Sequence, residues 1–337
     1  MMTYIRRFSI FFLSWVSLAG AQASAQVSTV YAAVVATKLF VVGGANAPSG
    51  IFFQRSGSDT VWGHTGPDNI RAFDVAVPRA AKGMVRYIAA GNGVHKTTDG
   101  GLHWKVTTGW EITEVLWVAP DPKDESTVYI ATAYGIYKTT DGCSTWHQMN
   151  RGLTSTFTSC VIVDHASSST LYCTTEDGAF VSYNGAASWT RLGLSVADTR
   201  VIAQNPRDSG MLVVGTENNG IYISRNGGKW WEKSEAGVDH STFYTITFDP
   251  NNPDRLFAGG YVTGIYKSVD GGGSWKRIND GIATLSIHGI VVDPNNSNTV
   301  YAATFWNGVY RSEDGGTSWK PDGLGGSEVW NIHIESH

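Results

Sequence analysis

The stretch "GIYKTTDGCSTW", residues 135–146, decides the fold, because close copies of it return along the chain. "GVHKTTDGGLHW" (93–104), "GIYKSVDGGGSW" (264–275) and "GVYRSEDGGTSW" (308–319) all place an aspartate five residues before a tryptophan. Two further copies, "SYNGAASW" (182–189) and "SRNGGKWW" (224–231), carry asparagine in its place. The chain therefore repeats one small turn. This turn either stabilises the fold or forms part of a functional site.

The copies recur at a nearly constant period of 42, 42, 43, 42, 44 and 44 residues. A first copy, "GIFFQRSGSDTVW" (50–62), is one residue longer and has lost the turn. A period of this length in a strand-rich chain predicts stacked or circular repeats. The tryptophans that mark the seven copies are Trp62, Trp104, Trp146, Trp189, Trp231, Trp275 and Trp319.

Each repeat is interpreted as four short strands; in the sixth they are "FYTITFD", "RLFAGG", "GIYKSV" and "SWKRI". The 39 glycines, 13 tryptophans and 14 tyrosines agree, since glycine suits tight turns and aromatic residues suit half-buried strands. Seven repeats of four strands predict an all-β chain folded as a seven-bladed β-propeller. The C-terminal "EVWNIHIES" (328–336) matches the first strand of a repeat, so we expect it to close the ring as the inner strand of the first blade. "STVYAAVV" (28–35) is expected to add an outer or alternative strand there.

The first 25 residues have a different character from the repeats. A short basic segment, an apolar run and "AQASA" before Gln26 are typical of a cleaved secretory signal. We therefore expect residues 1–25 to be removed and residues 26–337 to form a single propeller that is periplasmic or extracellular and monomeric. The formal charge of −4 gives no basic footprint for nucleic acid. No motif indicates a cofactor.

The pattern Ser/Thr-x-Asp-x-Gly-x-x-Trp resembles the Asp-box, or BNR, repeat of sialidase-like propellers, over essentially the whole chain after the signal. The resemblance implies the propeller fold. It implies no one function, because sialidases, xyloglucanases, sortilin-type receptors and photosystem II assembly factors share the repeat. A sialidase is disfavoured: the Arg-Ile-Pro motif is missing, and "NIRAFDVAVP" (69–78) does not reproduce it.

The recurring turn is interpreted as scaffold. An Asp or Asn side chain can accept hydrogen bonds from backbone N–H groups two residues on, and the tryptophan can fill the gap between blades. A Ca²⁺ site is disfavoured because the aspartates lie on separate blades, and no metal is expected. The structural residues are Asp99, Trp104, Asp141, Trp146, Asn184, Trp189, Asn226, Trp231, Asp270, Trp275, Asp314 and Trp319.

A binding face is expected opposite the turns, where the loops between strands two and three and between blades emerge. Aromatic residues outside the tryptophan register can stack on sugars or anchor a protein, although such a side chain can equally fold over its own blade. Arg200, Tyr244, His288 and Trp330 share one register and are expected to ring the central channel. The ligand-binding candidates are Arg71, Trp110, Arg200, Tyr244, Tyr261, Trp306 and Trp330.

Two classes of function fit this face. We favour a non-catalytic recognition scaffold that binds a protein or a glycan. The alternative is a carbohydrate-active enzyme, a glycoside hydrolase more than a polysaccharide lyase, which would need two carboxyl groups roughly 5–10 Å apart in one pocket. The catalytic candidates for that alternative are Glu111, Glu176, Glu217, Asp239 and His288.

Three cysteines complete the set of candidates. If the turn after residue 163 is centred near residues 166 and 167, Cys160 faces Cys173 across two antiparallel strands, at a Cα separation of ~4.5–5.5 Å. In an oxidising compartment this pair can form a disulfide, and two buried thiols are the alternative. Cys143 would remain single.

Overall fold

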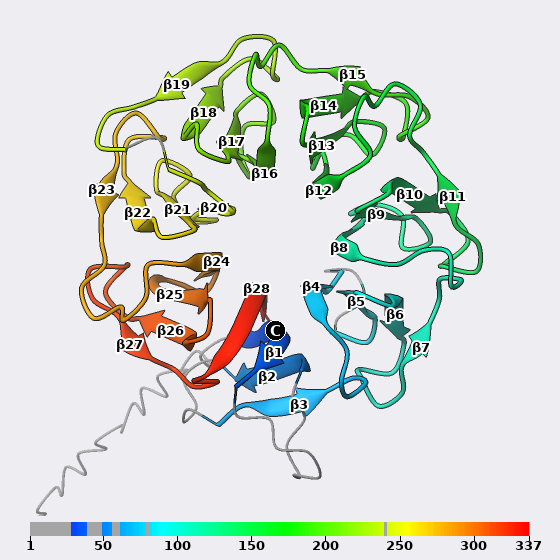
Figure 1. Ribbon diagram of the computed structural model, residues 1–337, viewed down its shortest axis with the longest axis horizontal. Helices are drawn as coiled ribbons and strands as arrows, with labels where there is room; N and C mark the ends of the chain where they lie inside the picture. Colours follow the sequence, from blue (N-terminus) through cyan, green and yellow to red (C-terminus); the bar gives the residue numbers. More distant parts are fainter. Residues whose placement is uncertain are drawn as a thin grey trace, which may run out of the picture.

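The computed structural model describes residues 28–38, 49–55, 61–78, 81, 83–238 and 241–336, which form seven four-stranded antiparallel sheets around a central axis (Figure 1). The predicted all-β, seven-bladed propeller is confirmed. None of the described residues forms a helix long and apolar enough to cross a membrane. The expected signal, residues 1–25, lies outside the described residues.

The blades follow one another along the chain, and each runs from an inner to an outer strand. Blade 1 is β28 (Ser327–Ser336), β1 (Ser28–Thr37), β2 (Gly50–Arg55) and β3 (Gly63–Thr65). Blade 2 is β4 (Ala72–Ala76), β5 (Arg86–Ala90), β6 (Gly93–Thr97) and β7 (Lys105–Val106). Blade 3 is β8 (Val115–Pro120), β9 (Val128–Thr132), β10 (Gly135–Thr139) and β11 (His147–Gln148).

The remaining four blades repeat this order. Blade 4 is β12 (Thr158–Val163), β13 (Leu171–Thr175), β14 (Gly178–Ser182) and β15 (Thr190–Arg191). Blade 5 is β16 (Thr199–Gln204), β17 (Leu212–Thr216), β18 (Ile221–Ser224) and β19 (Glu232–Ser234). Blade 6 is β20 (Thr245–Phe248), β21 (Leu256–Gly260), β22 (Gly264–Ser268) and β23 (Lys276–Arg277), and blade 7 is β24 (Ile287–Asp293), β25 (Asn296–Thr304), β26 (Gly308–Ser312) and β27 (Lys320–Pro321).

The ring closes in blade 1, where the two ends of the chain meet in one sheet. The C-terminal β28 is the inner strand, as predicted, and pairs along its length with β1. "STVYAAVV" does add a strand to this blade, but not an outer one, because β1 lies second, between β28 and β2. Trp62 reinforces the closure, since its indole Nε1 donates to the carbonyl oxygen of Asp322 in blade 7, 2.5 Å away. The first copy of the turn, although altered, thus keeps a tryptophan that binds the neighbouring blade.

Neighbouring blades are held together by apolar side chains and by a repeated lysine contact. The second strand of each blade from blade 2 to blade 7 is almost wholly buried, which fits a strand with a blade packed against each of its faces. Lys96, Lys138 and Lys267 stand at the same position of their blades, and each donates from Nζ to a carbonyl in the turn of the next blade, at 3.0, 3.1 and 2.7 Å. The lysine at this position is therefore a structural residue.

The aspartate turn, defined as the eight residues from Ser/Thr to Trp (312–319 in blade 7), is closed by two side chains. Ser318 N donates to Asp314 Oδ1 at 2.9 Å, so the carboxylate reaches four residues on rather than the expected two. Ser312 Oγ donates to the same Oδ1 and accepts from Gly316 N. The hydroxyl of Ser318 also donates to the carboxylate, which holds the pKa of Asp314 at about 2. The Ser or Thr that begins the motif is thus as much a part of the turn as the aspartate.

The tryptophans of several turns reach back to the preceding blade, whereas Nε1 of Trp104 and of Trp231 donates to a carbonyl of its own turn. Trp319 is 3% exposed, and its Nε1 donates to Ile278 O of blade 6 at 2.9 Å. Gly281 of blade 6 has a φ of +85°, and a Cβ there would lie 2.1 Å from Trp319 O. A glycine is required at this position both by the backbone conformation and by the close approach of the next blade.

The predicted pairing of Cys160 with Cys173 is wrong. A β-bulge between Thr158 and Cys160 shifts the register, so that Cys160 pairs with Thr174 and Cys173 with Val161. Cys160 packs in the cluster between blades 4 and 5, and Cys173 in the cluster between blades 3 and 4. The two thiols therefore point to opposite faces of one sheet, and both are free, as is Cys143.

One carboxyl group joins three blades near the axis. Asp74 of β4 accepts from Asn331 Nδ2 of β28 at 2.8 Å and from Val118 N of β8 at 3.1 Å. Burial raises the pKa of Asp74 from 3.8 to about 7, although these hydrogen bonds partly oppose the rise. Asp74 thus links the closing strand to the next two blades.

Removal of a turn tryptophan should destabilise the ring. Trp275 is 5% exposed, and its Nε1 donates to Ser234 Oγ of the preceding blade. We expect Trp275→Ala to lower the free energy of unfolding by ~3–5 kcal/mol, measured by urea denaturation. The matched control is Trp230→Ala, whose side chain is 67% exposed on an equivalent turn, with an expected change within ~0.5 kcal/mol. Equal losses in the two variants would contradict the packing role.

The stability of the protein should depend on the protonation of Asp74. Because its folded pKa lies above the unfolded one, its contribution to stability is complete below the unfolded pKa and is lost as the pH rises through about 7. We expect Asp74→Asn, which keeps one acceptor oxygen, to show a smaller loss of stability than the wild type between roughly pH 4 and pH 7. Thermal unfolding across this range measures the difference. Parallel pH profiles for the two proteins would show that Asp74 does not titrate there.

Candidate functional site

A bulge in the inner strands turns one side chain of each blade toward the mouth of the central channel. The register of the inner strand slips by one residue between Thr199 and Val201 of β16, and Arg200 is the extra residue. The same slip occurs in five other blades, and in blade 6 the equivalent residue directly precedes β20. A bulge re-aims the side chain that it inserts. The residues at this position, called here the bulge residues, are Phe73, Leu116, Ser159, Arg200, Tyr244, His288 and Trp330.

Six of these bulge residues line a pocket of about 420 Å³, called here the funnel pocket. Loops between second and third strands contribute Glu217, Tyr261 and Phe305, so the pocket opens on the face opposite the aspartate turns. The volume is within the range typical of small-ligand sites. The full lining is Leu116, Trp117, Phe157, Ser159, Arg200, Glu217, Tyr244, Tyr261, His288, Phe305, Trp330 and Asn331.

Aromatic rings form a continuous wall along the blade 6, 7 and 1 side of the pocket. The His288 ring lies 5.4 Å from the ring of Tyr244, 4.7 Å from that of Trp330 and 5.6 Å, stacked, from that of Phe305, measured between centroids. Trp330 in turn meets Phe73 edge to face at 5.4 Å. Such contacts fix the orientation of the rings, so the wall is largely aromatic and its rings are held in place.

His288 is the polar group within this wall. Its side chain is 8% exposed, and burial lowers the pKa of the imidazole to about 4, so the ring is neutral near pH 7. Within the described part of the chain its ring nitrogens have no hydrogen-bond partner, while the residue lines the pocket. A neutral imidazole offers one donor and one acceptor to a bound molecule.

The opposite wall carries an ion pair. Arg200 donates from Nε to Glu217 Oε2 at 2.7 Å and from Nη2 to the same oxygen, and its guanidinium lies over the ring of Phe157. The arginine side chain is 20% exposed and the glutamate 33%. Burial and the negative charge of Glu217 raise the pKa of Tyr244 nearby, with Arg200 opposing. The charged groups are therefore built into the wall and already paired.

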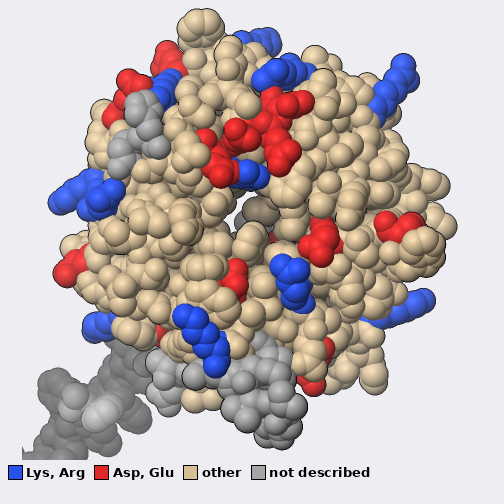
Figure 2. Space-filling view, in the orientation of Figure 1, with Lys and Arg blue, Asp and Glu red and all other residues tan. Residues whose placement is uncertain are grey.

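Acidic residues gather on the loops outside this ion pair. Asp198 N donates to Glu176 O at 2.6 Å and Glu217 N donates to Asp198 O at 2.8 Å, so three acidic residues are joined in series through their backbones. Figure 2 shows Asp and Glu side chains grouped beside the central opening, near the top of the view where Figure 1 draws β16–β19. The mouth of the funnel is therefore acidic on the side of blades 4 and 5.

The opposite side of the mouth carries two further candidates, Arg71 and Trp306. Arg71 is 60% exposed, lies 3.9 Å from Glu114 and stacks over Phe73. Trp306 meets Phe305 edge to face and lies under the ammonium group of Lys38, outside the pocket lining. These residues form the rim of the funnel rather than its wall.

The structure separates the other predicted candidates from the pocket. Trp110 is 91% exposed on the loop between β7 and β8, and Glu111 beside it is also exposed. Glu176 does not line the pocket, and Asp239 lies outside the described residues. Among the described lining residues, Glu217 is the single carboxylate. No group of three His, Cys, Asp or Glu side chains that could hold a metal occurs in the described ranges.

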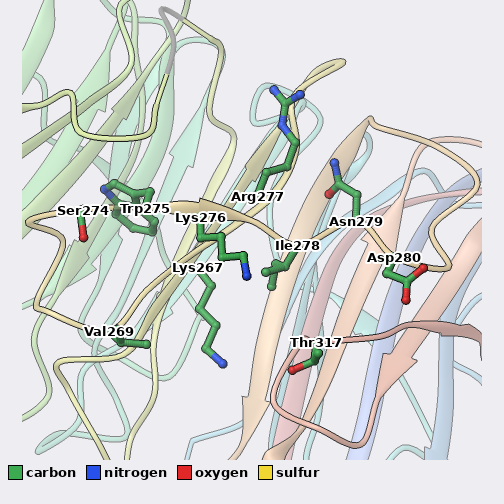
Figure 3. Close-up of a pocket in the computed structure, with 10 residues that line it drawn as sticks. All are labelled: Lys267, Val269, Ser274, Trp275, Lys276, Arg277, Ile278, Asn279, Asp280 and Thr317. Atoms are coloured by element: carbon green, nitrogen blue, oxygen red, sulfur yellow. The ribbon is translucent and has the colours of Figure 1, made fainter.

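A second cavity, of about 480 Å³, lies at the outer edge between blades 6 and 7 (Figure 3). Figure 3 shows Lys267 and Lys276 along one side of this groove and Thr317 across from them. Between blades 2 and 3 an equivalent groove of about 450 Å³ is lined by Lys96, Trp104, Lys105 and Ser144 at corresponding positions. The repeat itself therefore produces this groove, and the lysine that enters it already binds the next blade.

Several lining residues escaped the sequence analysis. Trp117 directly follows the inner-strand register residue of blade 3, Phe157 lies two residues before that of blade 4, and Phe305 directly precedes the candidate Trp306; their aromatic character was the available signal. The sequence did not predict the bulge, because period-two alternation alone does not reveal which side chain of an inner strand faces the channel.

No protein-family model matches the chain, and no curated protein matches it. Solved structures share its fold. A GH74 enzyme of Niastella koreensis is 19% identical with a TM-score of 0.62, and the match covers 74% of this chain and 44% of that enzyme. YCF48 bound to D1 peptide is 16% identical with a TM-score of 0.60, covering 81% of this chain and 95% of that one. The extracellular domain of the one-component system BT4673 from B. thetaiotaomicron is 14% identical with a TM-score of 0.62, covering 87% and 39%.

The chain thus spans less than half of the GH74 and BT4673 proteins and nearly all of YCF48. At these identities the likeness concerns the fold alone. What the comparisons establish is that this chain has a seven-bladed propeller of the kind found in GH74 enzymes, in YCF48 and in the BT4673 extracellular domain.

Proposed function

We propose that the protein is an exported, non-catalytic recognition scaffold of the Asp-box class that binds a protein or a glycan in the funnel pocket, opposite the aspartate turns. One observation carries this proposal. The described lining of the pocket is largely aromatic, and its single carboxylate, Glu217, is tied to Arg200. Aromatic walls with a few fixed polar groups suit binding.

A glycoside hydrolase would need further catalytic groups in the same pocket. It needs a general acid and a second carboxylate on either side of one scissile bond. Glu217 has no second carboxylate beside it in the lining, and Glu111 and Glu176 lie outside it. The shared fold with GH74 enzymes keeps this alternative as the competitor that an experiment must exclude.

Two further observations support a binding role outside the cytoplasm. The YCF48 structure, which this propeller matches over most of both chains, holds a D1 peptide, so a propeller of this size can bind a protein segment. The sequence of residues 1–25 has the character of a secretory signal, and the BT4673 neighbour is an extracellular domain. We therefore place the protein in the periplasm or outside the cell.

Substitution at the pocket should weaken binding without affecting the fold. Tyr261 lines the funnel pocket and is 55% exposed, so Tyr261→Ala should leave the melting temperature near the wild-type value. For whichever ligand a screen of glycans and peptides identifies, we expect its affinity to fall about tenfold, or about 1.4 kcal/mol. Calorimetric titration measures this loss, and mass spectrometry of the same samples looks for cleaved product.

Trp230→Ala, on the turn face, is the matched control and should bind as the wild type does. Cleaved glycan in the wild-type samples would refute the non-catalytic proposal. Weaker binding by Trp230→Ala, with Tyr261→Ala unchanged, would place the binding surface on the turn face instead.

A further inference from the structure

We propose that the funnel pocket binds a primary ammonium group, such as a lysine side chain or a free amino terminus carried by a protein partner. This inference rests on the proposed function, because it names the ligand class for the same site. It is carried by three features of the pocket and its mouth: aromatic faces and an unpartnered neutral imidazole in the lining, and an excess of carboxylates at the mouth on the side of blades 4 and 5.

The aromatic faces are the first feature. Tyr244, Tyr261 and Trp330 line the pocket together, and each presents an electron-rich ring. Cations are attracted to the faces of such rings, most strongly where the site excludes water. Tyr244 and Trp330 both pack against His288, which holds two of the three rings in place before any ligand arrives.

The balance of charge is the second feature. Glu217 is in the pocket wall, and consecutive backbone hydrogen bonds join it to Asp198 and then to Glu176 on the neighbouring blade 4. Arg200 supplies one guanidinium against these carboxylates and bonds to Glu217 alone among them. The blade 4 and 5 side of the funnel therefore keeps a negative potential, which draws cations toward the opening.

His288 is the third feature. It is more than nine-tenths buried, it lines the pocket, and no side chain or backbone group of the described residues hydrogen-bonds to its ring. Burial keeps the imidazole neutral, so one ring nitrogen is free to accept a hydrogen bond. An ammonium group carries three donors and no acceptor, which suits an acceptor surrounded by aromatic rings.

An anionic ligand fits this arrangement poorly. Nε and Nη2 of Arg200 both donate to Glu217, so a ligand carboxylate would have to displace Glu217 before it could use these groups. It would then stand beside the freed Glu217, and like charges at short range repel.

The test uses small probes and two variants with opposite expected effects. The probes are Nα-acetyl-lysine N-methylamide, its neutral norleucine analogue and the anionic glutamate analogue, together with a neutral xyloglucan oligosaccharide. Binding to the full chain is followed by tryptophan fluorescence and by NMR of the His288 imidazole. We expect the lysine probe to bind, the norleucine and glutamate probes to bind at least about tenfold more weakly, and affinity for lysine to fall with added salt.

Glu217→Gln should weaken lysine binding about fivefold or more, whereas Arg200→Gln should strengthen it, because it removes the one positive charge in the wall. Glu313→Gln, whose exposed carboxylate is paired with Arg311 on a turn of the other face, is the matched control and should change nothing. Melting temperatures close to the wild-type value establish that each variant is folded.

Each alternative outcome overturns a different statement. If the glutamate probe binds best and Arg200→Gln abolishes that binding, the pocket is an anion site and the ammonium inference is wrong, while the recognition function stands. If only the oligosaccharide binds, uncleaved, the inference is again wrong and the ligand is a glycan. If the oligosaccharide is cleaved, the proposed function fails. If no probe binds and a partner later found is indifferent to Tyr261→Ala, both proposals fail.

Discussion

The pairing of β28 with β1 is the interaction on which the rest of the structure depends. It joins residues from the two ends of the described chain in one sheet, Ser28 facing Ser336, and so converts a row of repeats into a ring. A closed ring leaves no unpaired blade face, which allows the second strands to be buried on both sides. Asp74 binds Asn331 of the closing strand, and Trp62 binds blade 7, so closure is fixed near the axis and at the outer edge.

Closure of the ring also explains why residues repeat on one face of the propeller and vary on the other. On one face, the aspartate turns of blades 2 to 7 and their tryptophans are nearly identical in sequence, and Nε1 of Trp275 and of Trp319 donates to the preceding blade. On the other face, the bulge residues differ in every blade, from Ser159 to Trp330. A position that packs against an equivalent neighbour is constrained, whereas one that faces an open channel is free to vary and can acquire a ligand. The variety of the bulge residues is therefore what makes the funnel distinctive.

The fold could be predicted from the sequence alone because the repeat recurs seven times. Seven tryptophans at a fixed spacing define the blade, and the match of residues 328–336 to an inner strand predicts closure. The prediction that was wrong concerns a strand register that a single extra residue changes. The bulge at Ser159 shifts the register by one and moves Cys160 away from Cys173, and no periodicity reveals such an insertion. The sequence left the position of β1 open, because an apolar strand pattern does not say which strands of a sheet it pairs with.

For the candidate site, the shared register of Arg200, Tyr244, His288 and Trp330 predicted that they would lie together, and the structure brings them to one pocket. The sequence could not predict the ion pair between Arg200 and Glu217, because this pair depends on how a loop between second and third strands folds over its own inner strand. The single carboxylate in the lining was equally hard to predict, since several acidic residues occupy loops on this face and the sequence does not give the directions of their side chains.

We infer that ligands bind in the funnel and that the aspartate turns hold the ring. Hydroxyl-radical footprinting with mass spectrometry, with and without a saturating ligand, compares both faces in one experiment. The account predicts that oxidation of Tyr244, Tyr261 and Trp330 falls on binding, while that of Trp230 and Tyr183, both exposed on the turn face, stays constant. Protection of Trp230 and Tyr183 with unchanged oxidation of the funnel residues would contradict it.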